Sequence, residues 1–380
     1  MYIFEILLCL SIGVAITIKA PTLILTVLGN ESLSLTMSSL SLRVALCLSI
    51  IYILIQRKSI TPIVCVLAIL ASMILIQPYN IDTSLYSHKI IIVGLSGFVC
   101  GYSISNPLNL IKATGGLSIM YGICYIALVL LGFNEQFDSM ILGYTLTPIV
   151  CWLILLWFIS TRARFWLVME IFVLIVIMLL MSSRGCIITI AAAIIAITFF
   201  NNYKKGMRLG DFVKIYIPVI FLVYVAYVLI VPILAKSDMA LSGSFLHKMN
   251  DSMLLDDNGR DDISTMAIDL IQDNIIGGVG ICRDREILGY VFPHNIFIEI
   301  FLHYGIPIGL FILIMYWTNI INLIRNKHIR ITSIALIVIM CCYTWIRLLV
   351  SDTYIDNMYP LLFILGVCFS IKNKPISSAC

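Results

Sequence analysis

Long runs of apolar residues restrict the folds open to this chain more than any other feature of its sequence. A helix needs about 20 mostly apolar residues to cross the roughly 30 Å hydrocarbon core of a membrane. Of the 380 residues, 61% are hydrophobic and 12% are charged, whereas about 45–50% of residues are apolar in typical soluble domains. We therefore expect an all-α fold, that of a polytopic membrane protein.

Twelve segments fit a membrane-spanning helix, so the sequence predicts about 12 transmembrane helices. Their approximate ranges are 2–18, 37–55, 60–77, 88–105, 116–133, 140–159, 165–182, 184–200, 212–234, 294–317, 331–348 and 357–371. The first range lacks a basic leader and a clear cleavage site, so we expect a retained helix. The expected organisation is a single membrane domain, with helices 1–9 in residues 1–235, a large loop over 236–292 and helices 10–12 in 293–380.

The distribution of Lys and Arg predicts how the chain is oriented in the membrane. If the N-terminus is cytoplasmic, the inside loops and the C-terminal end hold 14 of the 24 Lys and Arg residues and a single acidic residue, Asp211. An even number of spans returns the C-terminus to the same side. Both termini are therefore expected in the cytoplasm and the loop 236–292 outside.

The outside loop contains a predicted amphipathic helix. Its apolar residues follow helical spacing, at Ile263, Met266, Ala267, Leu270 and Ile271. The sequence "GGVG" at residues 277–280 has no Gly-Lys-Ser/Thr after it, so it indicates a helix end and a turn rather than a phosphate loop. We expect the apolar face of this helix to pack on the membrane domain.

Two outside arginines, Arg184 and Arg260, have both a structural and a functional interpretation. Arg184, in "LLMSSRGCIIT", either reaches the membrane surface with its charge or binds an anion together with Ser183 and backbone N–H groups at the start of the next helix. Arg260 either binds an anion or forms a helix-start salt bridge with the adjacent acids. Arg285 belongs to "CRDRE", whose alternating charges are typical of a solvated surface.

Polar residues also gather at the start of a late apolar segment, "FPHNIFIEIFLHYGIPIG". His294 and His303 are nine residues apart and face opposite sides of a helix. Glu299 and His303, four residues apart, share a face and are expected to pair with each other in the core. His294 follows Pro293, a residue that favours a turn or the first turn of a helix.

Taken in order, "SSRG", "GRDDISTMAIDLIQDNIIGGVG" and "PHNIFIEIFLHYGIPIGLFIL" resemble motifs of the O-antigen polymerase and O-antigen ligase superfamily of bacterial envelopes. The resemblance implies glycosyl transfer from undecaprenyl pyrophosphate at the periplasmic face of the bacterial inner membrane. Carried over by position, Arg184 and Arg260 hold the pyrophosphate and His294 is the catalytic base, with Arg347 a further anion contact. The supporting residues that it suggests are Asn295, Ser183, Glu299 and His303.

The favoured hypothesis is an O-antigen polymerase of lipopolysaccharide biosynthesis, and the alternative is an O-antigen ligase that transfers the glycan to lipid A-core. A lipid-linked oligosaccharide transporter is a lesser alternative, because charged residues within the spans are too sparse for an ion path. No zinc-type Cys/His spacing and no Asp-x-Asp occur in the outside loops, so we expect neither a metal nor a cofactor.

The expected partners are lipid-linked oligosaccharides as donor and acceptor, membrane lipids and a chain-length regulator protein, but no nucleic acid.

Overall fold

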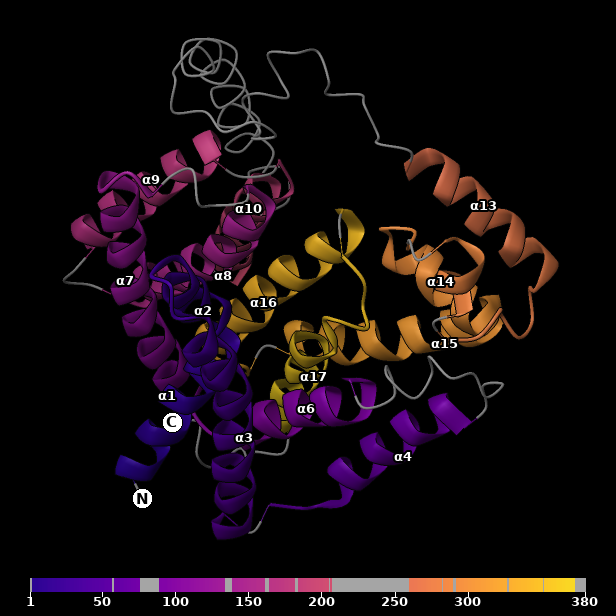
Figure 1. Ribbon diagram of the computed structural model, residues 1–380. Coiled ribbons are helices and arrows are strands. Elements are labelled where there is room, and N and C mark those ends of the chain that lie inside the picture. Colours follow the sequence, from indigo (N-terminus) through magenta and orange to yellow (C-terminus); the bar gives the residue numbers. More distant parts are fainter. Residues whose placement is uncertain are drawn as a thin grey trace. The chain divides into compact units, whose positions relative to one another are not determined.

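The fold is all-α in the part of the chain that the computed structural model describes (Figure 1). No β-strand occurs among these residues, which are 2–56, 58–75, 89–133, 139–160, 164–181, 184–204, 206, 260–281, 283–289, 292–326, 328–350 and 352–372.

The predicted spans correspond closely to the observed helices. These are α1 (Tyr2–Ile16), α2 (Lys19–Val27), α3 (Glu31–Ile55), α4 (Thr61–Leu75), a π-helical turn η1 (Lys89–Val93), α6 (Gly94–Ser103), α7 (Pro107–Leu130), α8 (Ser139–Ile159), α9 (Arg164–Met181), α10 (Arg184–Lys204), α13 (Arg260–Asp273), α14 (Arg283–Ile287), α15 (Ile296–Arg325), α16 (Ile331–Val350) and α17 (Met358–Lys372). The ninth predicted span, 212–234, lies outside the described residues.

Six of these helices, α3, α7, α8, α10, α15 and α16, are long and apolar enough to cross a membrane, and the bent pair α1 and α2 makes a seventh candidate. Helices α4, α6 and α17 also have apolar stretches, but these are shorter. This content of apolar helices confirms the prediction of a polytopic membrane protein.

The first predicted span differs from a simple helix over 2–18. The chain bends by 60° between α1 and α2, and the second helix was not predicted. Pro21 has no N–H to donate to the carbonyl of Thr17, which accepts instead from the N–H of Ala20 at 2.9 Å. The side-chain hydroxyl of Tyr125 donates to the carbonyl of Ala20, also at 2.9 Å, so a carbonyl at the bend has a partner.

The chain divides into two compact units. Unit 1 contains residues 1–43, 107–256 and 330–343, and unit 2 contains residues 44–106, 257–329 and 344–380. In unit 1, α7 packs against α1, α8 and α9. A Cβ atom on Gly115 of α7 would come within 2.9 Å of Leu156 Cβ on α8, so the absence of a side chain allows this close approach.

In unit 2, α6 and α17 pack with their backbones in direct contact (Figure 1). A Cβ atom at Gly97 would lie 2.3 Å from the carbonyl oxygen of Tyr359, and one at Gly101 would lie 2.2 Å from that of Phe363. These glycines are four residues apart, the spacing that lets membrane helices approach closely.

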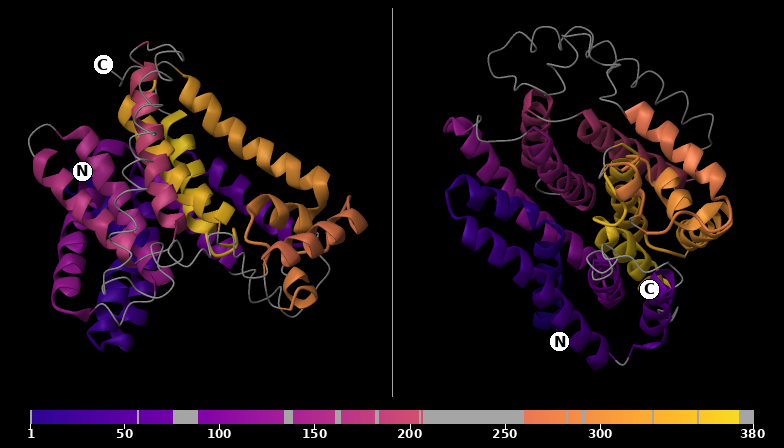
Figure 2. Two further views of the ribbon diagram at one scale, coloured as in Figure 1. Left: turned by 90° about the horizontal axis from the view of Figure 1, so that it is seen from above. Right: turned by 45° about the vertical axis from the view of Figure 1, so that its right-hand side comes forward.

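The tenth predicted span, 294–317, is not one continuous helix. Within α15 the backbone of Gly305 has φ 74° and ψ 168°, which breaks the helix, and Pro307 follows two residues later. The part before the break, from Ile296 to Tyr304, packs against α13 and α14, which lie beside it in Figures 1 and 2. Ala267 and Ile271 of α13 form a buried cluster with Leu302. The predicted amphipathic helix is therefore confirmed, and four residues of its predicted apolar face pack in this cluster, but the fifth, Met266, is exposed.

The turn 275–280 supplies partners for the backbone groups that the break in α15 releases. In a continuous helix the carbonyls of Leu302 and His303 would accept from residues 306 and 307. Here Leu302 accepts from the N–H of Val279 at 2.7 Å, and His303 accepts from that of Gly280 at 3.2 Å. The N–H of Ile306 donates to the carbonyl of Ile275 at 2.8 Å. The two glycine-containing segments, "GGVG" and "YGIP", are therefore paired through their backbones.

We predict that Gly305→Ala destabilises the protein more than Gly289→Ala does. Both glycines have positive φ, 74° and 71°, so an alanine at either position is strained by about 1–2 kcal/mol. A Cβ atom on Gly305 would also lie 2.4 Å from the carbonyl oxygen of Ile276, whereas Gly289 has open space around it. The midpoint of thermal unfolding in detergent should fall further for Gly305→Ala. Equal shifts would show that the backbone contact adds nothing to the conformational strain.

Candidate functional site

His294 lies immediately before the first turn of α15, in an unusual backbone conformation. Of the described residues other than glycine, His294 alone has a positive φ, at 49°. Such conformations are uncommon outside glycine and cost free energy, and they occur disproportionately at functional sites. The next residue, Asn295, caps α15, because its side-chain oxygen accepts from the N–H of Phe297 at 3.0 Å. The predicted base and its neighbour are thus fixed at the start of a helix.

Aromatic and cationic side chains surround His294. The centroid of its ring lies 4.3 Å from that of Phe292. The guanidinium carbon of Arg285, on α14, lies 5.3 Å from the centre of the Phe292 ring. Phe292 therefore contacts both the imidazole and a cation.

The two arginines predicted to hold pyrophosphate each begin a helix. Arg184 is the first residue of α10, in unit 1, and Arg260 is the first residue of α13, in unit 2. The start of a helix carries unpaired N–H groups and the positive end of the helix dipole, and both favour an anion. The side chains of Arg184 and Arg260 lie outside the described part of the structure, as does Ser183.

The further predicted anion ligand, Arg347, is paired within the protein. It lies near the end of α16 with 7% of its surface exposed, and its guanidinium forms an ion pair with Asp352. An anion bound to Arg347 would compete with this carboxylate.

Glu299 and His303 are both buried, at 1% and 0% exposure. We expected them to pair with each other, but the polar contacts of each are with other residues. The Nε2 atom of His303 lies 2.9 Å from Oδ1 of Asp284, and its Nδ1 atom lies 2.8 Å from the hydroxyl of Tyr354. Glu299 accepts hydrogen bonds from the Thr353 hydroxyl and from the N–H of Tyr354, the latter at 3.1 Å. The sequence could not indicate these partners, because Thr353 and Tyr354 lie about 50 residues further along the chain.

The charged run "CRDRE" is not uniformly solvated as its alternation suggested. Arg283 is exposed, but Asp284 is completely buried and the Arg285 side chain is 12% exposed. Burial raises the pKa of the Asp284 carboxyl, but His303 and Arg285 lower it by more, so this pKa lies below its ordinary value. Helix α14 is only five residues long, too short for a periodic pattern to show which side chain faces inward.

Asp284, Glu299 and His303 are the group of described residues best arranged to bind a metal ion. Their potential ligand atoms all lie within 4.8 Å of one another. Two acidic and two basic side chains already meet here, because Nη2 of Arg285 lies 4.0 Å from Oε1 of Glu299. The arrangement therefore suits a buried network of ion pairs, and such networks stabilise a fold only when every charged group has a partner.

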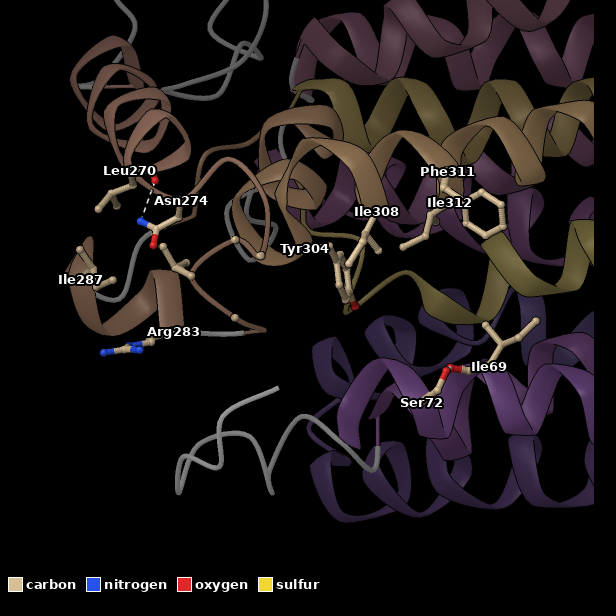
Figure 3. A pocket seen from close by; sticks show the side chains of 14 residues that line it. Ile69, Ser72, Leu270, Asn274, Arg283, Ile287, Tyr304, Ile308, Phe311 and Ile312 are labelled. Carbon is tan, nitrogen blue, oxygen red and sulfur yellow. Dashed lines mark hydrogen bonds between the residues drawn. The ribbon is translucent and has the colours of Figure 1, made fainter. Parts of the chain in front are cut away.

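Unit 2 also contains a cavity of about 550 Å³ (Figure 3). Leu270, Asn274 and Ile287 line one part, Tyr304, Ile308 and Phe311 of α15 line another, and Ile69 and Ser72 of α4 lie across from them. The turn 277–280 and Arg283 complete its lining. None of the residues predicted from the sequence to take part in catalysis or to bind pyrophosphate is among those that line it.

Comparison with known proteins gives one match. Residues 169–314 match the family model described as O-antigen ligase, and this range includes Arg184, Arg260 and His294 but ends before Arg347. No curated protein and no solved structure matches the chain. Over this range the chain is similar to the superfamily of O-antigen ligases and polymerases, whose members are membrane glycosyltransferase-like enzymes.

Proposed function

We propose that the protein is an O-antigen polymerase. It transfers a growing glycan from undecaprenyl pyrophosphate onto the sugar of another lipid-linked repeat unit, at the periplasmic face of the bacterial inner membrane. The observation that carries this proposal is the family match over residues 169–314, which includes all three residues that the motifs assign to the reaction. Two of these residues begin helices, and the third stands immediately before the N-cap of one.

In the proposed reaction His294 acts as the general base. The hydroxyl of the acceptor sugar loses its proton to the imidazole as its oxygen forms a bond to the anomeric carbon of the donor. The bond between that carbon and the phosphate oxygen breaks, and undecaprenyl pyrophosphate leaves with the electron pair. Attack from the side opposite the leaving group inverts the anomeric centre. Histidine suits proton transfer near neutral pH, and such a base contributes typically about 10²–10⁴-fold to a rate.

Arg184 and Arg260 are proposed to hold the pyrophosphate. A guanidinium group binds phosphate oxygens through two parallel hydrogen bonds, and it stays charged as negative charge develops on the leaving group. The first turns of α10 and α13, which these arginines begin, add backbone N–H donors, and their partial positive charge also favours an anion. Two such sites provide the positive charge that a metal ion provides in many other phosphate-dependent enzymes.

An O-antigen ligase is the second candidate, because the family match is shared by ligases and polymerases. The ligase uses the same donor and the same chemistry but a different acceptor, lipid A-core. The residues assigned to the donor and to the base serve both reactions equally.

Replacement of the proposed base should abolish polymerisation without loss of the protein. We expect His294→Ala to lower the transfer rate by about 10²–10⁴-fold, because the acceptor hydroxyl loses its proton acceptor. Cells with this variant should carry one repeat unit on their lipopolysaccharide instead of a ladder of lengths, as seen on gels. His328→Ala, at an exposed position after α15, is the matched control and should leave the ladder unchanged. A normal ladder in His294→Ala would contradict the assignment.

Conservative replacement of the proposed anion ligands should also impair transfer. Arg184→Lys and Arg260→Lys keep the charge but lose the two-pronged hydrogen bonding, so we expect a higher KM for the lipid-linked donor and slower turnover. Arg164→Lys is the matched control, because Arg164 also begins a helix, α9, and is exposed. Full activity in Arg184→Lys at wild-type expression would mean that this arginine only anchors the helix at the membrane surface.

The products formed by purified protein should separate the two candidate functions. Protein supplied with lipid-linked repeat units is expected to form polymer whether or not lipid A-core is present, and to do so in EDTA. Transfer that requires lipid A-core would identify a ligase instead. Loss of activity in EDTA that returns with a divalent cation would contradict the metal-independent mechanism.

A further inference from the structure

We propose that Phe292 and Arg285 are positioning residues that set the orientation of the His294 imidazole. This inference rests on the proposed role of His294 as base, and it assigns roles to two residues that the motifs leave without one. Arg285 does not touch the imidazole directly through any described contact; it acts through the ring of Phe292.

The position of His294 in the chain explains why neighbouring side chains are needed to orient its imidazole. It precedes the N-cap of α15, and its φ of 49° is uncommon for a residue other than glycine. The side chain is only partly buried. Its orientation therefore depends on neighbouring side chains, and the Phe292 ring, 4.3 Å away between centroids, is one of them. Ring pairs at this separation have a preferred relative geometry.

Arg285 in turn fixes the ring of Phe292. Its guanidinium carbon lies 5.3 Å from the ring centre, within the range of a cation–π contact. The guanidinium is itself held, because Nη2 donates to the Thr353 hydroxyl at 3.3 Å and lies 4.0 Å from Oε1 of the buried Glu299. A nearly buried cation with defined partners is a firmer support than a solvated one.

The backbone that carries Arg285 is anchored by its neighbour. Asp284, completely buried, lies 2.9 Å from His303 on α15. Helix α14 is therefore attached to α15 at Asp284, and Arg285 projects from it toward Phe292. The buried Glu299 and His303 therefore support the positioning of His294 through their contacts with Arg285 and Asp284.

The test compares two replacements of the same ring. Phe292→Leu keeps an apolar side chain but loses the aromatic contact, and we expect kcat to fall by about 10- to 100-fold, the effect of a misplaced catalytic group. KM for the lipid-linked donor should stay within about threefold, because the arginines that bind it are untouched. Phe292→Tyr, which keeps the ring, should recover most of the loss. Phe172→Leu, at an exposed position on α9, should behave as wild type.

Arg285→Lys is the second variant. It keeps the positive charge beside Glu299 but loses the planar group that lies against Phe292, so we expect the same fall in kcat at unchanged KM. Wild-type kcat in both Phe292→Leu and Arg285→Lys would overturn the proposal. Equal losses in Phe292→Leu and Phe292→Tyr, or a loss confined to KM, would overturn it as well.

A readout independent of turnover separates this proposal from the proposed function. Diethyl pyrocarbonate modifies exposed imidazoles, and mass spectrometry of the peptide containing His294 measures the rate of modification at this residue. We expect Phe292→Leu to raise that rate and Phe292→Tyr to leave it near wild type. If wild-type protein shows no glycosyl transfer but the modification rates follow this order, the polymerase proposal fails while the ring contact stands. Identical rates in all three proteins would overturn the contact itself.

Discussion

Backbone groups cannot remain without hydrogen-bond partners where water is scarce, and this constraint determines the arrangement of the outer part of unit 2. Pro307 lacks an N–H and Gly305 has left the helical conformation, so the carbonyls of Leu302 and His303 need donors from elsewhere. Val279 and Gly280 supply them. That pairing brings the turn 275–280 onto α15, and with it α13 and α14. The Asp284–His303 contact, and the support of Arg285 by Glu299, follow from the same docking.

The parts of this arrangement that depend on local pattern could be predicted from the sequence. Apolar runs predicted helices, and the spacing from Ile263 to Ile271 predicted the loop helix and, except for the exposed Met266, its buried face. The glycines of "GGVG" were correctly interpreted as a turn, since Gly278 and Gly280 both have positive φ. These features depend on neighbours within a few residues, where periodicity and turn chemistry are informative.

Features that depend on distant partners could not be predicted. The break at Gly305 requires donors from residues 279 and 280, so the apolar run 294–317 alone predicted an unbroken span. Asp284 looked solvated because its partner His303 lies 19 positions away, on another helix. Arg184, Arg260 and His294 were identified by resemblance of motifs, and the family match covers all three.

The paired backbones of "GGVG" and "YGIP" also have a consequence for how the protein is made. The two donors, Val279 and Gly280, precede their acceptors in the chain, so they are synthesised first and gain these partners only once Leu302 and His303 have been made. The turn 275–280 and the broken part of α15 therefore complete their backbone pairing together, and neither segment has these hydrogen bonds before the other is in place.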